Sequence, residues 1–113
     1  MNVQSVLGNL PVTVVAGNDF SQTITGGYVS DLLSNVMGQA AAGNVWITMQ
    51  GHQNIVAVAS LVGMSGIIVA GGASVDNETV NRAQAENIPI LRTGLSTYAV
   101  AGRLYACGIQ AEA

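Results

Sequence analysis

The residues of this chain that could bind or transform a ligand gather after short apolar runs. Ser30, Gln50, Gly71 and Thr93 each follow such a run, about 20 residues apart, which is the length of a strand–helix unit with short loops. Right-handed crossovers between parallel strands bring such junctions to one edge of a sheet, where open α/β folds bind ligands. The polar and glycine residues expected there are Ser30, Asp31, Gln50, His52, Gln53, Asn54, Gly71, Gly72, Ser74, Thr93 and Ser96. Because loops after parallel strands are polar in any such fold, a structural role is the alternative.

Two glycine pairs and one arginine have groups that could bind an anion. Gly26-Gly27 and Gly71-Gly72 let the backbone approach a ligand and can present N–H groups to it, although each pair also suits a simple turn. Arg92 beside Thr93 could clamp a phosphate or carboxylate, with an exposed or ion-paired arginine as the alternative. The motif GxxxxGK[ST] cannot occur because the chain has no lysine. The candidate ligand-binding residues are Gly26, Gly27, Ser30, Asp31, Gln50, His52, Asn54, Gly71, Gly72, Arg92 and Thr93.

Groups suited to catalysis are sparse. His52 is the only histidine and Cys107 the only cysteine, and their separation in sequence predicts neither a metal site nor a cofactor. We expect His52 to be a hydrogen-bonding loop residue and Asp31 to cap a helix with Ser30 as the alternative cap. Cys107 is expected to be a small buried hydrophobe. A small enzyme using His52 and Asp31 is the least favoured hypothesis, since no second carboxylate pairs with Asp31 for acid–base work.

The stretch 44–72 predicts the architecture that positions these residues. It reads as a strand, a helix over Asn54–Val62 and a second strand, and both strands are too apolar to leave one face in water. Trp46 and Met49 are expected in the core. The chain is therefore assigned to the α/β class, with a mostly parallel sheet of about four to five strands and helices on both faces.

The remaining segments extend the same pattern through a single domain spanning residues 1–113. Further strands are expected at 12–16, 28–30 and 89–91, beside those at 45–49 and 66–70. Further helices are expected at 2–7, 32–37, 78–87 and 97–107, with Ser96 as the cap of the last one and Gly108 just beyond its end. The segment 22–25 is expected at a sheet edge, and the helix at 78–87 on the surface because its apolar stripe is narrow.

The helix over Asn54–Val62 also predicts self-association. It is apolar on all sides, and a helix of that kind is buried on all sides. If the sheet buries only one of its faces, a second subunit would cover the other, which favours a homodimer with two-fold symmetry. The alternative is that the N-terminal segment covers it.

Composition excludes several partners. With three arginines, no lysine and a net charge of −3, the chain lacks the clustered cations that nucleic-acid binding requires. Glycines interrupt the long uncharged stretch 32–75, and no cationic flank accompanies it, so no membrane span is expected. One cysteine and the lack of a signal-peptide pattern predict a cytoplasmic protein.

Three segments together resemble a known family: TGGYVSDLLSNVM, WITMQGHQNIVAVASLVGMSGIIVAGG and IPILRTGLSTYAVAGRL. They look like a DRTGG domain, similar to the N-terminal domain of HPr kinase/phosphorylase and the middle domain of some phosphotransacetylases. Stand-alone versions are often found beside iron-only hydrogenase genes. The name-giving motif survives only as Thr25-Gly26-Gly27, with Thr23 and Ile24 at its charged positions, and the kinase half of HPr kinase is missing.

This resemblance implies a non-catalytic, ligand-sensing or dimerising α/β domain in the cytoplasm. Combined with the residues above, it favours a regulatory homodimer that binds a small anionic metabolite or nucleotide at the carboxyl edge of the sheet. The alternative is a scaffold or assembly partner of an iron-only hydrogenase complex, acting through its apolar surface.

Overall fold

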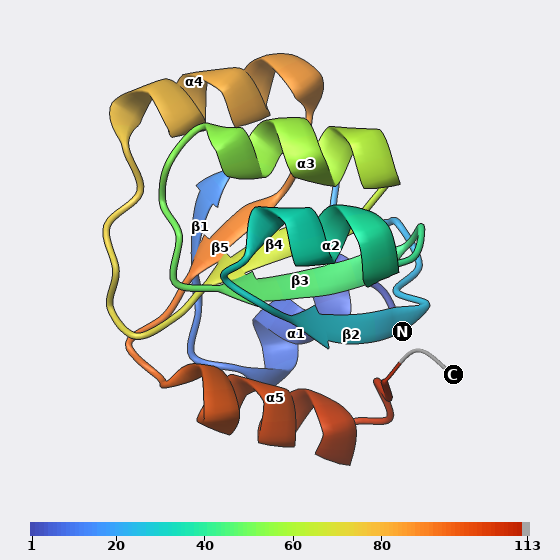
Figure 1. Ribbon diagram of the computed structural model, residues 1–113. Coiled ribbons are helices and arrows are strands. Elements are labelled where there is room, and N and C mark those ends of the chain that lie inside the picture. Colours follow the sequence, from blue (N-terminus) through green and yellow to red (C-terminus); the bar gives the residue numbers. More distant parts are fainter. Residues whose placement is uncertain (112–113) are drawn as a thin grey trace.

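A computed structural model describes residues 1–111 and contains one five-stranded sheet in the order β1-β5-β4-β3-β2 (Figure 1). Three of the four pairings, β2 with β3, β3 with β4 and β4 with β5, are parallel, whereas β1 pairs with β5 in the antiparallel direction. The strands are β1 (Thr13–Ala16), β2 (Gly26–Val29), β3 (Asn44–Thr48), β4 (Gly66–Val69) and β5 (Ile90–Arg92).

Five helices cover the two faces of this sheet. They are α1 (Val3–Asn9), α2 (Leu33–Gln39), α3 (Asn54–Val62), α4 (Asn77–Glu86) and α5 (Thr97–Ala106). The helices α2, α3 and α4 link successive parallel strands and lie together on one face, while α1 and α5 lie on the other (Figure 1). Crossovers of one hand that step in one direction along a sheet must all fall on the same face, which accounts for this division.

The neighbouring interior strands β3 and β4 contribute to the core on both faces of the sheet. Every residue of β3 and β4 is buried. Trp46, Ile67 and Val69 pack in the cluster under α2, α3 and α4, whereas Ile47 and Ile68 pack in the cluster against α1 and α5. Because successive side chains of a strand point to opposite faces, a strand covered on both sides reads as a continuous apolar run. The expected α/β class with helices on both faces is confirmed.

The helix predicted at Asn54–Val62 has the predicted ends, but its burial has a different cause. It lies between α2 and α4, which pack against its flanks while the sheet buries its inner face (Figure 1). Of its apolar residues, Leu61 is 74% exposed. Neighbouring helices therefore account for the burial of its flanks, and the homodimer stays a prediction.

Each predicted helix and strand is present with ends shifted by at most two residues, and the larger shifts concern glycine. Gly26 and Gly27 belong to β2 instead of preceding it, and α2 continues through Gly38 to Gln39. At α5, Ser96 caps the helix as predicted by accepting a hydrogen bond from the N–H of Ala99 at 3.1 Å.

Three local predictions fail. The N-cap of α2 is Leu32, which makes no side-chain capping bond, so neither Ser30 nor Asp31 caps that helix. Met49, expected in the core, is 49% exposed because β3 ends one residue earlier and Met49 lies in the loop beyond it. Cys107, expected to be buried, is instead partly exposed because it lies at the C-cap of α5, where the helix ends. Within residues 1–111, no helix has the length and apolar character needed to cross a membrane.

Candidate functional site

The loops that follow β2, β3, β4 and β5 meet at the carboxyl edge of the sheet, because these four strands run parallel. Hydrogen bonds link the loops in sequence. The main-chain oxygen of Gly51, in the β3–α3 loop, accepts the Thr79 hydroxyl at 2.7 Å and the Asp76 N–H at 3.1 Å. These hydrogen bonds hold the loops of the carboxyl edge together, and most of the predicted site residues lie in these loops.

Asp31 connects the loop after β2 to the end of β3 and the loop that follows it. Its Oδ1 accepts hydrogen bonds from the Thr48 hydroxyl and from the Met49 N–H, each at 2.7 Å. The Gln50 side-chain amide donates to the Asp31 main-chain oxygen at 3.4 Å, and the indole N–H of Trp46 donates to the Ser30 main-chain oxygen at 2.8 Å. Since an exposed carboxylate repels anions, this acidic corner (Ser30, Asp31, Thr48 and Gln50) is unsuited to an anionic ligand.

His52 has the expected role of a hydrogen-bonding loop residue. Its Nδ1 accepts the N–H of Asn54 at 3.1 Å, at the first residue of α3. This bond satisfies one of the donors that every helix start leaves free, and it requires that Nδ1 carry no proton. Among residues 1–111, no hydrogen bond joins His52 to Asp31, so the two groups form no acid–base pair in this arrangement.

A cleft of about 360 Å³ lies at the other end of the same edge, where β1 and β5 meet. The Arg92 guanidinium is held there by two backbone acceptors, with Nε donating to the Ala73 oxygen at 2.7 Å and Nη2 to the Gly72 oxygen at 2.9 Å. Its other N–H groups have no acceptor within the described part of the chain. We call this site the arginine cleft; it is lined by Pro11, Thr13, Val15, Gly72, Arg92, Thr93 and Gly94.

The glycine pair Gly71-Gly72 forms a tight turn instead of an anion cradle. Both residues have positive φ angles, 70° and 71°, which a glycine adopts at no steric cost. Their N–H groups donate to the main-chain oxygens of Leu95 at 2.7 Å and Thr93 at 3.0 Å. The idea that these N–H groups face a ligand is therefore wrong, although Gly72 still lines the arginine cleft.

The other glycine pair does not reach the carboxyl edge at all. Gly26 and Gly27 open β2, at the opposite edge of the sheet, and the Gly27 N–H donates to the main-chain oxygen of Gln110 at 2.9 Å. The predicted set therefore divides into three parts: the acidic corner with His52 and Asn54 nearby, the arginine cleft, and the distant pair in β2.

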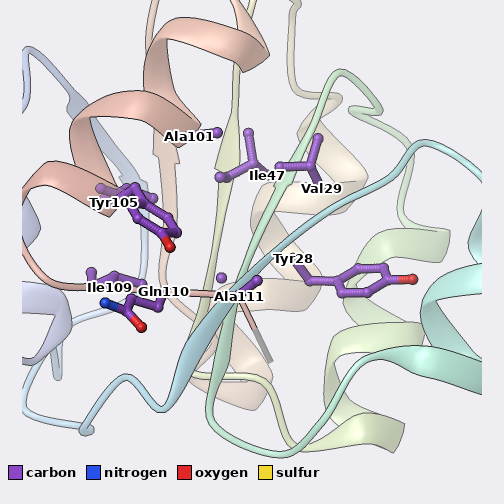
Figure 2. A pocket seen from close by; sticks show the side chains of 10 residues that line it. Tyr28, Val29, Ile47, Ala101, Tyr105, Ile109, Gln110 and Ala111 are labelled. Atoms are coloured by element: carbon purple, nitrogen blue, oxygen red, sulfur yellow. The ribbon is translucent and has the colours of Figure 1, made fainter. Parts of the chain in front are cut away.

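Sequence reasoning missed two features of these surfaces. It did not place β1 beside Arg92, because nothing in a local pattern shows which edge of the sheet an antiparallel strand joins. It also missed a half-enclosed hollow of about 280 Å³ between β2 and α5 (Figure 2). We call it the β2–α5 pocket; it is lined by Gly27, Tyr28, Val29, Ile47, Ala101, Leu104, Tyr105, Ile109, Gln110 and Ala111.

The topology and its carboxyl edge define a layered α/β domain with hydrogen-bonded loops and a cationic cleft at that edge. The sequence matches the model of the DRTGG domain family over residues 5–107, and the chain belongs to that family. A comparison with curated protein sequences gave no significant match.

A solved structure shares this fold. It is the crystal structure of the CBS and DRTGG domains of the regulatory region of Clostridium perfringens pyrophosphatase, complexed with the activator diadenosine tetraphosphate. It is similar over 90% of the present chain, with 17% sequence identity and a TM-score of 0.68. The present chain corresponds to 45% of that longer chain, so the likeness concerns the fold of one part of it.

Proposed function

We propose that this protein is a non-catalytic regulatory domain that binds a small anionic ligand, such as a nucleotide, in the arginine cleft. The observation that carries the proposal is the position of Arg92, whose guanidinium is fixed at the carboxyl edge with N–H groups left for a ligand. A planar guanidinium with several donors suits phosphate and carboxylate oxygens.

The other two arginines do not offer an equivalent site. Arg82 pairs with Glu86 on α4 at 3.0 Å, and Arg103 lies in the last turn of α5 on the opposite side of the sheet. With six acidic residues in the chain, an anion would be repelled from most other surfaces. Of the candidate ligand-binding residues, Gly72, Arg92 and Thr93 are therefore the ones proposed to contact an anionic ligand.

The comparison structure supports a regulatory role and suggests which ligands to test first. Its DRTGG domain lies in the regulatory region of an enzyme, and that region was crystallised with a phosphate-rich dinucleotide activator. For the present chain we therefore choose inorganic phosphate, AMP and diadenosine tetraphosphate as probes. A regulatory domain needs no catalytic group, which agrees with the structural roles of Asp31 and His52.

Backbone amide NMR titration tests the proposal directly. At least one of the three probes should give saturable shifts at the amides of Gly72, Thr93 and Gly94. Arg92→Gln should weaken binding about tenfold or more, the loss expected when a charge-assisted hydrogen bond is removed. Arg103→Gln is the matched control, because it removes the same charge from α5, and it should change binding less than about twofold. No saturable shift with any probe, or equal losses in both variants, would refute this function.

We also propose, as a separate point, that the chain forms a homodimer. Native mass spectrometry of the purified chain should then report twice the mass of one chain. The alternative, an assembly partner of an iron-only hydrogenase, is favoured by Leu61 and Tyr98, which are 74% and 89% exposed. Co-purification with hydrogenase subunits that is lost in Leu61→Ser or Tyr98→Ser, with no ligand added, would support the alternative over ligand sensing.

A further inference from the structure

We propose that the β2–α5 pocket binds a neutral, flat ring ligand of about two fused rings, such as a nucleobase or an indole. The pocket belongs to neither the acidic corner nor the arginine cleft. It lies where β2 forms the edge of the sheet, between β2, α5 and residues 109–111 (Figure 2). Its walls, its size and its lack of charge each restrict the class of ligand.

The walls come from three separate parts of the chain. Figure 2 shows Val29 and Ile47 entering from the sheet, Tyr105 from α5, and Ile109 with Gln110 from the segment that follows. This segment is anchored, because the Gly27 N–H donates to the Gln110 oxygen at 2.9 Å and Ile109 is buried. The pocket is thus built on strands and a helix, so its shape is largely formed before a ligand arrives.

The size of the pocket selects ring-sized ligands. An apolar cavity of about 150 Å³ is enough to hold benzene. A hollow of about 280 Å³ therefore has room for a fused bicyclic ring. The Tyr105 ring, 59% exposed, forms a wall that such a ring can stack against.

The lining excludes charged ligands. None of the ten lining residues carries a charge at neutral pH, and most of the exposed lining is apolar. Burying a charged group there without a partner would cost far more than the contacts return. The Gln110 side chain can donate and accept hydrogen bonds, so the favoured ligand is neutral with a polar edge.

The ring of Tyr28 does not take part. It points to the other face of the sheet, where its hydroxyl donates to Asn35 Oδ1 at 2.7 Å (Figure 2). Only Val29 and Gly27 of β2 therefore face the pocket, and both are small. This arrangement leaves open the space that a bulky side chain at either position would fill.

The β2–α5 pocket is independent of the arginine cleft. In the sheet, β2 and β5 are separated by β3 and β4. At about 4.8 Å per strand this places them roughly 14 Å apart. The inference does not rest on the proposed anion site, and each can fail while the other holds.

The test is an amide NMR titration of the whole chain with indole and adenine as neutral probes and indole-3-carboxylate as the charged one. At least one neutral probe should give saturable shifts at Gly27, Val29 and Gln110, and the charged probe should bind about tenfold more weakly. Absence of saturable shifts at these amides up to about 10 mM probe, or equal binding of the charged probe, would overturn the proposal.

Two matched pairs of variants separate the pocket from the general surface of α5. Ala101→Leu fills the pocket and should weaken binding about tenfold, whereas Ala106→Leu makes the same change outside it and should alter binding less than about twofold. If Ala101→Leu fails to fold, Tyr105→Ala removes the aromatic wall, with Tyr98→Ala as its control. Equal effects within a folded pair would overturn the proposal, as would loss of binding in Arg92→Gln.

Discussion

The carboxylate of Asp31 accepts the hydroxyl of Thr48 at 2.7 Å and thereby ties the loop after β2 to the end of β3. Thr48 is fully buried, whereas Asp31 is exposed, so the bond joins a surface loop to the core of the sheet. The Thr48 hydroxyl also accepts the N–H of Gln50 at 3.1 Å, which extends the link into the β3–α3 loop. One acidic side chain thus helps to fix two loops of the carboxyl edge.

We expect this bond to be measurable as an interaction free energy. Asp31→Ala and Thr48→Val should each lower the free energy of unfolding by about 1–2 kcal/mol. The double variant should cost less than the sum of the two by about 0.5–1 kcal/mol, because both changes remove the same bond. Urea unfolding of the four proteins measures this. Asp76→Ala, at a cap residue without a side-chain capping bond, is the control, and strict additivity would contradict the assigned role.

Gly51 has no room for a side chain. A Cβ atom built there would lie 1.9 Å from the main-chain oxygen of Ser74 in the next loop. Gly51→Ala should therefore force the two loops apart and lower the free energy of unfolding by about 1–3 kcal/mol. Gly102→Ala, in the middle of α5 with nothing within 4 Å of the new Cβ, should raise it by about 0.5–1 kcal/mol. A Gly51→Ala variant that unfolds at or above the temperature of the unsubstituted protein would show that the loops are not closely packed.

Ser65 offers a stabilising substitution. Its hydroxyl is buried and has no hydrogen-bond partner within residues 1–111. Ser65→Ala removes an unpaired polar group, so it should leave the free energy of unfolding unchanged or raise it by up to about 1 kcal/mol. The matched comparison is Thr79→Val, which removes a buried hydroxyl that does donate, at 2.7 Å, to the Gly51 oxygen, and it should cost about 1–2 kcal/mol. A loss in Ser65→Ala as large as that in Thr79→Val would mean that Ser65 has a partner.

The hydrogen bonds that Asp19 accepts should make the free energy of unfolding depend slightly on pH. The Ser21 hydroxyl, at 2.6 Å, and then the Ser21 N–H, at 3.0 Å, donate to Asp19 Oδ1 and hold the pKa of its carboxyl below the ordinary value. Because the folded-state pKa is the lower one, this contribution is present above the unfolded-state pKa and is lost as pH falls through the folded-state pKa. NMR titration of the Asp19 carboxyl should show its midpoint rising in Ser21→Ala. The distant Ser34→Ala should leave it in place, and a midpoint unmoved by Ser21→Ala would remove the stated cause.

Local sequence patterns were sufficient for the order and type of the elements. The apolar runs that became β3 and β4 are too short for helices and too continuous for half-exposed strands, which leaves a sheet covered on both faces. The C-terminal end of α3 follows from the glycine at position 63, whose positive φ of 81° ends the helix. In each case the deciding interactions lie within a few residues of one another, so the sequence alone contains them.

The candidate site depended on contacts between distant segments, which no local pattern specifies. Asp31 suits a helix cap by its position, but in the fold its carboxylate bonds to Thr48, 17 residues away. The N–H groups of Gly71 and Gly72 could have bound an anion, but they donate hydrogen bonds to main-chain oxygens in the loop after β5. Only the tertiary structure decided that Arg92 faces a cleft against β1 and that α5 encloses a hollow beside β2. The physical reason is that a hydrogen-bonding group or an apolar face contacts whichever group the fold places next to it, and that neighbour is often distant in sequence.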